Sequence, residues 1–345
     1  MNSAQTVTPG PSLRGRGRAR IAGLVLALVL VPLAGLWAMT VGSSYIAPAT
    51  LVAALTQPDG SWAHIVVADV RLPRVVAGLL VGAQLAVAGA IMQAVTANPL
   101  ASPGLLGINA GAAFAVVLAL AFAGIDASGT LIWFAFMGAA VTALCVYVLG
   151  SFGRGGPTPL KLALAGAVVS AFLASLTASL LLLDQGTLDS VRLWSVGSLN
   201  GRPLSAVMAV APYGLAGLVA ALLLSRPIMT LSLGSDLAGS VGQNLVLWRL
   251  VAGGLVVLMA GAAVALAGPV GFVGLVVPHA ARLLAGPDYR WIMAYSAPMG
   301  AVLVVVADAG LRQVAGIDLP VGITMALIGA PVFILLARRQ SWSLR

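Results

Sequence analysis

Charged residues are scarce in this chain. Of its 345 residues, only 8% are charged and 60% are hydrophobic. A soluble globular domain carries roughly 25% charged residues. The composition therefore excludes a soluble cytosolic protein and predicts a chain that lies largely within a lipid bilayer.

Cysteine and histidine are rare as well. The single cysteine, Cys145, cannot form an intramolecular disulfide or a thiolate cluster. The two histidines, His64 and His279, lie far apart in the sequence, whereas a metal site needs several ligands close together. We therefore expect this chain to hold neither a resident metal nor a cofactor of its own.

Motifs for catalysis are also missing. The only lysine, Lys161, follows Leu160 instead of glycine, so there is no Walker A loop to bind ATP phosphates. Acidic residues cluster near the ends of the apolar segments, with Asp308 the deepest, whereas an ion-coupled carrier usually keeps ionisable groups near the middle of the membrane. We expect that the chain is not an enzyme and that another subunit drives any transport. A secondary transporter driven by an ion gradient is the alternative.

Basic residues are concentrated near the N-terminus. The net charge is +9, and Arg14-Gly-Arg-Gly-Arg-Ala-Arg20 resembles an RNA-binding segment. Arginines directly before a first apolar segment have a simpler function, which is to hold that end in the cytoplasm. We therefore expect a cytoplasmic tail over residues 1–20 and no nucleic acid partner. Residues 21–41 also resemble a signal-peptide core, but no small-x-small cleavage site follows, so we expect a retained helix.

Apolar windows of about 19 residues predict an all-α membrane protein with ten spanning helices. The expected spans are 21–41, 72–95, 105–124, 130–150, 160–183, 205–225, 249–267, 270–285, 292–311 and 320–337. The break near Gly268-Pro269 is expected because proline removes a helix donor and glycine weakens a helix. The spans form one transmembrane domain over 21–337, followed by a cytoplasmic tail over 338–345.

Ten spans and a cytoplasmic N-terminus place both termini in the cytoplasm. Most of the 18 lysine and arginine residues then lie inside, in agreement with the positive-inside rule. The exceptions outside are Arg71, Arg74, Arg192, Arg202 and Arg312.

Part of the chain recurs at a fixed interval. Several glycine, alanine and proline positions recur 179 residues later, from Gly82 to Gly261, and Pro99 and Pro278 are one such pair. Five spans separate the two copies, so we expect an inverted internal repeat, which is common among transport proteins. Within the first copy, Gly78, Gly82, Ala86 and Ala90 share one helix face and would let another helix approach closely.

Three of the outside arginines, Arg71, Arg74 and Arg312, sit at helix ends. One interpretation is that they snorkel to lipid headgroups or pair with Asp69 and Asp308. The other is a docking surface for an acidic partner, because the guanidinium group presents a planar fork to carboxylates. The residues alone leave both open.

Two polar segments are too short to span a membrane. Residues 184–204 suggest a short interfacial helix at the outer face, with Trp194 at headgroup depth, or an ordinary loop. Residues 226–248 contain Leu237 and Val241, four apart on one helix face. That face could dock into a groove of a soluble partner or lie on the membrane surface.

Several motifs resemble, in order and over nearly the whole chain, the permease subunits of the FecCD type. They are Arg71-Leu-Pro-Arg74, Gly82-Ala83, Gly89 with Met92-Gln93, Asn98-Pro-Leu-Ala101 with Pro103-Gly104, Gly268–His279 with Arg282, Ala307-Asp308 with Arg312, and Leu319-Pro-Val-Gly322 with Gly329-Ala-Pro331. Such subunits belong to ATP-binding-cassette importers of iron–siderophore complexes, haem and vitamin B12.

The resemblance implies a type II importer permease in the cell membrane, with the following partners. A second permease subunit, either a copy or a paralogue, completes the conduit, and two cytosolic ATPases bind the ATP and Mg²⁺. An extracytoplasmic binding protein delivers the ligand. In the family, arginines matching Arg71, Arg74 and Arg312 face acidic residues of that binding protein, so the resemblance favours docking.

The resemblance also implies sites at the cytoplasmic side. The expected ATPase coupling residues are Leu233, Gly234, Asp236, Leu237, Ala238, Val241 and Gly242. The cytoplasmic gate aligns with Thr158, Pro159 and Leu160. Only its position is carried over, because Pro157-Thr-Pro159 departs from the vitamin B12 permease.

The expected mechanism is alternating access. ATP binding would draw the two ATPases together and tilt the fifth and tenth spans. The pathway would be lined by small, weakly polar side chains: Ser170, Ser175, Thr177 and Ser179. Iron(III)–siderophore is the expected ligand, with haem and vitamin B12 as alternatives.

Overall fold

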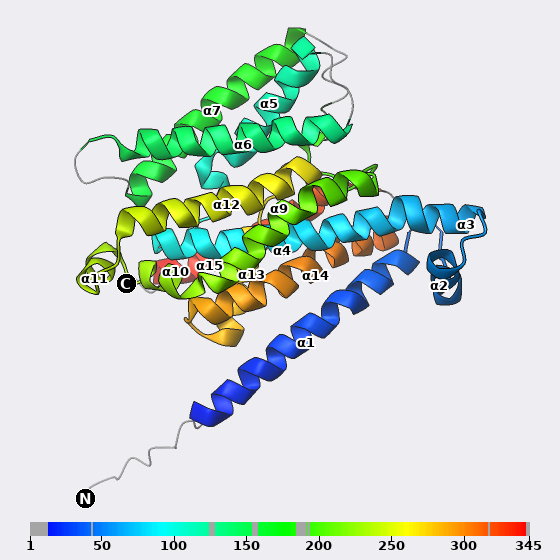
Figure 1. Cartoon of the computed structure of the whole chain (residues 1–345), viewed down its shortest axis with the longest axis horizontal. Coiled ribbons are helices and arrows are strands. Elements are labelled where there is room, and N and C mark those ends of the chain that lie inside the picture. The colour runs from blue at the N-terminus through cyan, green and yellow to red at the C-terminus, as the bar shows by residue number, and fades with distance from the viewer. Residues whose placement is uncertain are drawn as a thin grey trace, which may run out of the picture.

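The computed structural model describes residues 13–42, 44–123, 128–153, 158–183, 191, 194–316 and 318–342, and within them all regular structure is helical. Figure 1 shows long helices packed side by side in one elongated bundle. The short helices α2 and α3 lie at one end of this bundle and α11 lies at the other. The all-helical prediction is therefore confirmed.

The long helices coincide with the expected apolar segments. They are α1 (Leu13–Thr40), α4 (Leu72–Thr96), α5 (Ile108–Ala123), α6 (Ser128–Ser151), α7 (Pro159–Leu183), α9 (Leu204–Leu223), α12 (Leu245–Ala267), α13 (Val273–Ala285), α14 (Tyr289–Ala315) and α15 (Val321–Trp342). The two terminal helices extend into the expected tails, because α1 already begins at Leu13 and α15 continues to Trp342. Helices are limited by hydrogen bonding and not by the edge of the hydrocarbon layer, so each continues past its apolar segment.

Shorter elements connect these helices. They are α2 (Pro48–Thr56), α3 (Trp62–Ile65), the π-helical turn η1 (Val66–Arg71), the 3₁₀ turn η2 (Pro103–Leu106), α10 (Ser225–Leu231) and α11 (Ser235–Ser240). Helix α3, η1 and α4 follow one another without a break from Trp62 to Thr96. The sequence patterns did not reveal α2, α3 or η1.

Seven helices in the described part of the chain are long and apolar enough to cross a membrane. Three further apolar helices are shorter: Ile108–Phe122, Val273–Ala285 and Val321–Leu335. The 13 residues of α13 extend about 20 Å, less than the ~30 Å of a hydrocarbon core. The fold is thus a polytopic membrane bundle in which some crossings are shared between a short helix and its connection.

Helix α4 is the centre of the bundle. Of its most apolar 18-residue window, 83% is buried inside the protein, and it packs on α14, α12, α13 and α9. The expected small-residue face packs tightly on α14, because a Cβ at Gly82 would overlap the carbonyl oxygen of Gly300. Likewise a Cβ at Gly89 would overlap Gly274 in α13. Close backbone approach between small residues is how helices associate in lipid.

The expected break after α12 is confirmed, because the helix ends at Ala267 and Gly268 takes a left-handed φ of +71°. The register of the repeat is not supported by the elements. It pairs Gly89, inside α4, with Gly268, which caps α12, and Pro99, in a loop, with Pro278, inside α13. The inverted arrangement holds at the level of helices, since α4 starts at the α3 end of the bundle and α12 at the α11 end (Figure 1).

The peripheral helices leave large apolar faces uncovered. Only 6% of the apolar window of α7 and 17% of that of α1 is buried inside the protein. In Figure 1, α5, α6 and α7 form the edge of the bundle farthest from α1, and α1 lies beside α14. Such faces need hydrocarbon or another membrane subunit around them.

Candidate functional site

A cluster of charged side chains joins the N-terminal end of α4 to the C-terminal end of α14. Arg74 donates to both oxygens of Asp308, from Nε to Oδ2 at 2.9 Å and from Nη2 to Oδ1 at 2.8 Å. It also donates to both oxygens of Asp318, at 3.1 Å from Nη1 and 2.7 Å from Nη2. One guanidinium group therefore binds two carboxylates in the planar, bidentate way that arginine favours.

Arg312 completes the cluster on the other side of Asp308. Its Nη2 donates to Asp308 Oδ2 at 3.0 Å, one helical turn away on α14. Arg74, Asp308 and Arg312 are all largely removed from solvent, with Asp308 only 5% exposed. A buried carboxylate needs this much compensation, because leaving either partner unpaired costs several kcal/mol.

Arg71 lies apart from these ion pairs. It ends η1, and its buried guanidinium group donates to the carbonyl oxygens of Met39, at 2.7 Å, and Ser44. Gly42 packs directly on this group, so a side chain there would collide with it. Arg71 therefore holds the C-terminal end of α1 and the chain that follows it.

Asp318 lies in the connection between α14 and α15 and is the most exposed member of the cluster, with 43% of its side chain accessible. Asn200 donates to its Oδ2 at 2.9 Å. Partial burial alone would raise the pKa of the Asp318 carboxyl, but the hydrogen bonds and charge of Arg74 outweigh it and hold that pKa below its usual value. Asp318 is thus an anion that ties three separate segments together.

These contacts bear on the predicted docking residues. The structure brings Arg71, Arg74 and Arg312 to the same end of the bundle, but each already has partners within the chain. The predicted pairing with Asp308 is confirmed, whereas Asp69 is not a hydrogen-bond partner of Arg74 or Arg312. A role in docking stays a prediction, now for a surface whose arginines are largely buried.

The opposite end of the bundle carries the predicted coupling segment. Gly234 and Gly242 bracket α11 with left-handed φ values of +91° and +81°, which glycine adopts without strain. Between and beside them Leu233, Leu237 and Val241 are 52%, 60% and 68% exposed, whereas Ala238 is buried. The structure therefore confirms that these residues form an apolar face, and this face is not covered by the rest of the described chain.

Two hydrogen bonds fix this segment to the bundle. Gln243 Nε2 donates to the carbonyl oxygen of Pro227 in α10 at 2.8 Å. Arg249, in the first turns of α12, donates from Nη2 to Ser235 Oγ at 2.7 Å. Asp236 occupies the first turn of α11, where a negative charge interacts favourably with the helix dipole. The segment is thus a held structure with an exposed apolar side.

The predicted gate residues form the start of α7. The carbonyl oxygen of Thr158 accepts from Leu162 N at 3.0 Å, and its Oγ1 accepts from Lys161 N at 3.4 Å. Pro159 is the first residue of α7 and Leu160 is exposed. Leu162, at this end of α7, lines the same pocket as Arg249, so the predicted gate lies at the α11 end of the bundle.

The predicted pathway residues do not share one face of α7. Ser175 and Ser179 are exposed, and Ser179 Oγ donates back to the carbonyl oxygen of Ser175 at 2.9 Å. Ser170 and Thr177 are half-buried, and Ser170 lies close to Gly107 at the start of α5. Ser170 and Thr177 are seven residues apart and share one face of the helix, whereas Ser175 and Ser179 are four apart and share another. Only Ser175 and Ser179 therefore point to the uncovered side.

Trp194 is buried within the protein, and its carbonyl oxygen lies against Gly268 at the end of α12. Its predicted depth in the membrane stays a prediction. The tight turn at Gly268 has room for this backbone contact only because glycine lacks a Cβ. The preceding residues 184–190, on which the rest of this prediction depends, lie outside the described residues.

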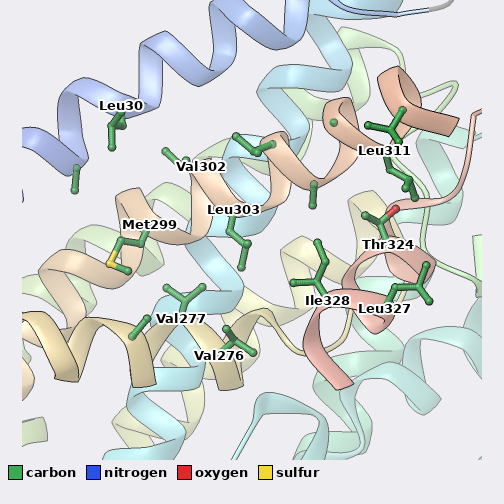
Figure 2. Close-up of a pocket in the computed structure, with 16 residues that line it drawn as sticks. Leu30, Val276, Val277, Met299, Val302, Leu303, Leu311, Thr324, Leu327 and Ile328 are labelled. Atoms are coloured by element: carbon green, nitrogen blue, oxygen red, sulfur yellow. The ribbon is translucent and has the colours of Figure 1, made fainter. Parts of the chain in front are cut away.

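A groove of about 620 Å³ runs between α1, α13, α14 and α15 (Figure 2). Leu303, Val277 and Ile328 point into it, and Thr324 contributes its hydroxyl group to an otherwise aliphatic or thioether lining. Such a lining offers nothing to hold a charged chelate or an anion. In the described part of the chain, no three His, Cys, Asp or Glu side chains converge on a possible metal site.

Sequence reasoning missed two polar contacts. It did not single out Asp318 or Asn200, although an aspartate just before a spanning helix is a reasonable partner for an arginine at the end of another. It named Gln93 and Arg282 as motif residues but missed their contact: Gln93 is fully buried in α4 and accepts from Arg282 Nη2 at 3.0 Å. Arg282 donates to Tyr289 as well, at 3.0 Å, so it links α13, α4 and the start of α14.

The fold, with a charged cluster at one end and an exposed apolar face at the other, defines a polytopic α-helical membrane permease. The FecCD transport family model matches residues 26–339, and the chain belongs to that family. The identifying motifs quoted above all lie within this match.

Two relatives and one solved structure illustrate the similarity. The probable siderophore transport system permease protein YfiZ of Bacillus subtilis is 47% identical over 83% of this chain and 86% of its own length. The Fe(3+)-citrate import system permease protein YfmD of the same organism is 40% identical over 95% and 98%. A metal-chelate type ABC transporter solved in an inward-facing conformation is 26% identical, with a TM-score of 0.80 over 92% of this chain and 98% of that chain.

Proposed function

We propose that this chain is the membrane-spanning permease subunit of an ATP-driven importer of iron(III)–siderophore complexes. The observation that carries the proposal is the pairing of two different ends on a FecCD-type bundle. One end has an arginine–aspartate cluster, and the other has an uncovered apolar face in and beside α11, formed by Leu233, Leu237 and Val241. Relatives that carry siderophores and ferric citrate support the choice of ligand.

The orientation follows from the charge distribution. Most arginines outside the cluster lie near the α11 end or in the N-terminal stretch, which supports a cytoplasmic location for that end. Two cytosolic ATPases would then bind the apolar face of α11 and supply the ATP hydrolysis that this chain lacks. The arginine cluster would face the extracytoplasmic binding protein.

The uncovered faces of α7 and α15 support pairing with a second permease subunit. Helix α7 is barely covered within this chain, and Leu327, Ile334 and Leu335 of α15 are exposed. Ser175 and Ser179, on the uncovered side of α7, would line a pathway between the two subunits. Thr158–Leu160, at the cytoplasmic start of α7, would close it.

The test is uptake into proteoliposomes. We expect uptake of ⁵⁵Fe–siderophore only when the ATPase subunits, ATP and the binding protein are all present. The ATP is supplied on the side of the vesicle that carries the ATPase subunits. Parallel assays with labelled haem and cobalamin decide the ligand. Uptake by this chain alone, abolished by collapsing an ion gradient, would instead establish a secondary transporter. Asp308, the deepest carboxylate, is paired with two arginines near one end, which argues against that alternative.

A further inference from the structure

The charges at the end of the bundle that carries the arginine cluster do not balance. Arg74 and Arg312 share two carboxylates, Asp308 and Asp318, so these four charges balance. Arg71 lies beside Arg312, and within the described residues it donates only to neutral oxygen atoms. With Arg71 counted, this end therefore has one positive charge in excess in a largely buried place, where such a charge attracts an anion strongly.

The two carboxylates on Arg74 are held very differently. Asp308 is buried on a long helix and has a second cationic partner in Arg312. Asp318 lies in a connecting segment, is 43% exposed, and has only the neutral amide of Asn200 as its other partner among the described residues. Of the two anions, Asp318 is the one that can leave Arg74 without abandoning a second charge in a buried site.

Asp318 also anchors the segment that leads into α15. Four residues after it, Gly322 N donates to the carbonyl oxygen of Gly197 at 3.0 Å. Gly322 lies against Val196 so closely that a Cβ there would collide with its carbonyl oxygen. Asn200, in the same segment, contacts Asp318. The carboxylate thus fixes the start of α15 both to α4 and to residues 196–200.

We propose that Asp318 is a displaceable counterion of Arg74: a carboxylate of an acidic protein docked at this end takes its place and frees the N-terminal end of α15. This inference rests on the proposed function, because it takes the extracytoplasmic binding protein as the acidic partner. The incoming carboxylate accepts from Nη1 and Nη2 of Arg74, the two nitrogens that now donate to Asp318. Docking is thereby coupled to the movement of α15 through the exchange of one salt bridge for another.

The exchange predicts that removing Asp318 strengthens docking. The probe is the purified binding protein of the same importer, titrated onto full-length permease with its ATPases in lipid nanodiscs. We expect D318N to lower its Kd about tenfold, the equivalent of ~1.4 kcal/mol, because no internal carboxylate competes for Arg74. D69N is the matched control, since it removes the same charge from an exposed residue that does not contact Arg74. Its Kd should stay near the wild-type value.

A second probe separates this inference from the proposed function. A fluorescent hexaglutamate peptide at low salt should also bind D318N more tightly than wild type or D69N. If the binding protein docks but D318N and D69N behave alike, the exchange is wrong and the importer assignment stands. If hexaglutamate shows the D318N effect and no binding protein docks, the exchange stands and the importer assignment fails.

Hydrogen exchange tests the same idea without a variant. In wild-type permease, docking should increase amide exchange at Gly322, whose hydrogen bond to Gly197 depends on the anchored connection. In D318N the amide should already exchange faster before docking. Unchanged or slower exchange at Gly322 on docking would overturn the proposal, whatever the affinities.

Discussion

Charged side chains are usually exposed and apolar side chains buried, and the two ends of this bundle depart from this distribution in different ways. At the α3 end, charged groups are buried and satisfied by one another, as Arg74, Asp308 and Arg312 show. At the α11 end, the apolar side chains of Leu237 and Val241 are exposed beyond the spanning helices. Removing one member of a buried ion pair leaves its partner buried and unpaired in the same chain, whereas exposed apolar groups on a held segment need another molecule to cover them.

The comparison teaches which end contributes to the stability of the isolated permease and which contributes only to its assembly. Removing a member of the charged cluster should damage the permease itself, because its partners are then left buried and unpaired. Changing the apolar face should leave the permease intact and damage only its assembly. The predictions below test this distinction, from the largest expected effect to the smallest.

The largest effect is expected for Asp308→Asn. Both Arg74 and Arg312 then lose an anionic partner in a buried site, which should cost about 3–5 kcal/mol of unfolding free energy. Thermal unfolding of the purified permease in detergent measures it, with Asp69→Asn as the exposed control. Equal unfolding temperatures for the two variants would show that the cluster contributes nothing to the stability of its end.

The double change Leu237→Asp and Val241→Asp tests the other end. It should weaken binding of the ATPase subunit about a hundredfold, because two exposed apolar contacts become charges that the interface must desolvate. Thermal unfolding of the isolated permease should not change. Val52→Asp, an equally exposed apolar position on α2, is the control for added charge. A loss of permease stability in the double variant would break the contrast between the two ends.

Helix packing at the centre gives a third, intermediate effect. Gly89→Ala places a Cβ on the backbone of Gly274 and should destabilise the bundle by about 1–3 kcal/mol. Gly253→Ala meets nothing within 4 Å and should instead gain up to about 1 kcal/mol from helix propensity. Unfolding temperatures of the two alanine variants should therefore shift in opposite directions. Shifts of the same sign would contradict the close contact between α4 and α13.

The smallest effect concerns pH and sharpens the account of the charged end. Because the folded pKa of Asp318 lies below its usual value, its stabilising contribution is complete above the unfolded pKa near ~3.9 and is lost as the pH falls through the folded pKa. The difference in unfolding temperature between wild type and Asp318→Asn should therefore shrink between about pH 5 and pH 3. A difference that stays constant over this range would mean that the carboxylate is not stabilised by Arg74.

Much of the fold could be predicted from residues that act locally. Long apolar segments fixed the positions of the spanning helices, and Gly268-Pro269 predicted the break after α12. The small face of Gly78, Gly82 and Ala86 predicted a close helix contact. The repeat register failed because a glycine- and alanine-rich chain offers many chance matches. The turn η1 was not foreseen because π-helical hydrogen bonding has no simple residue pattern.

The functional ends were predictable to different degrees. Gly234, Gly242 and the leucine–valine spacing located the exposed apolar face beside α11, because turn and helix periodicity depend on neighbouring residues. The arginines of the opposite end could be named from the sequence, but not their partners. Arg74 and Asp318 lie far apart along the chain, and only the packing of α4 against α14 brings them into contact.

By itself the sequence determined that this chain belongs in a bilayer, which segments form its long helices, and which small residues allow close packing. These properties depend on composition and on spacing along one helix. The tertiary structure decided which charges are satisfied within the chain and which apolar faces stay uncovered. Those depend on distances between segments remote in sequence, and a carboxylate on one helix stabilises an arginine on another only when the fold places them within hydrogen-bonding distance.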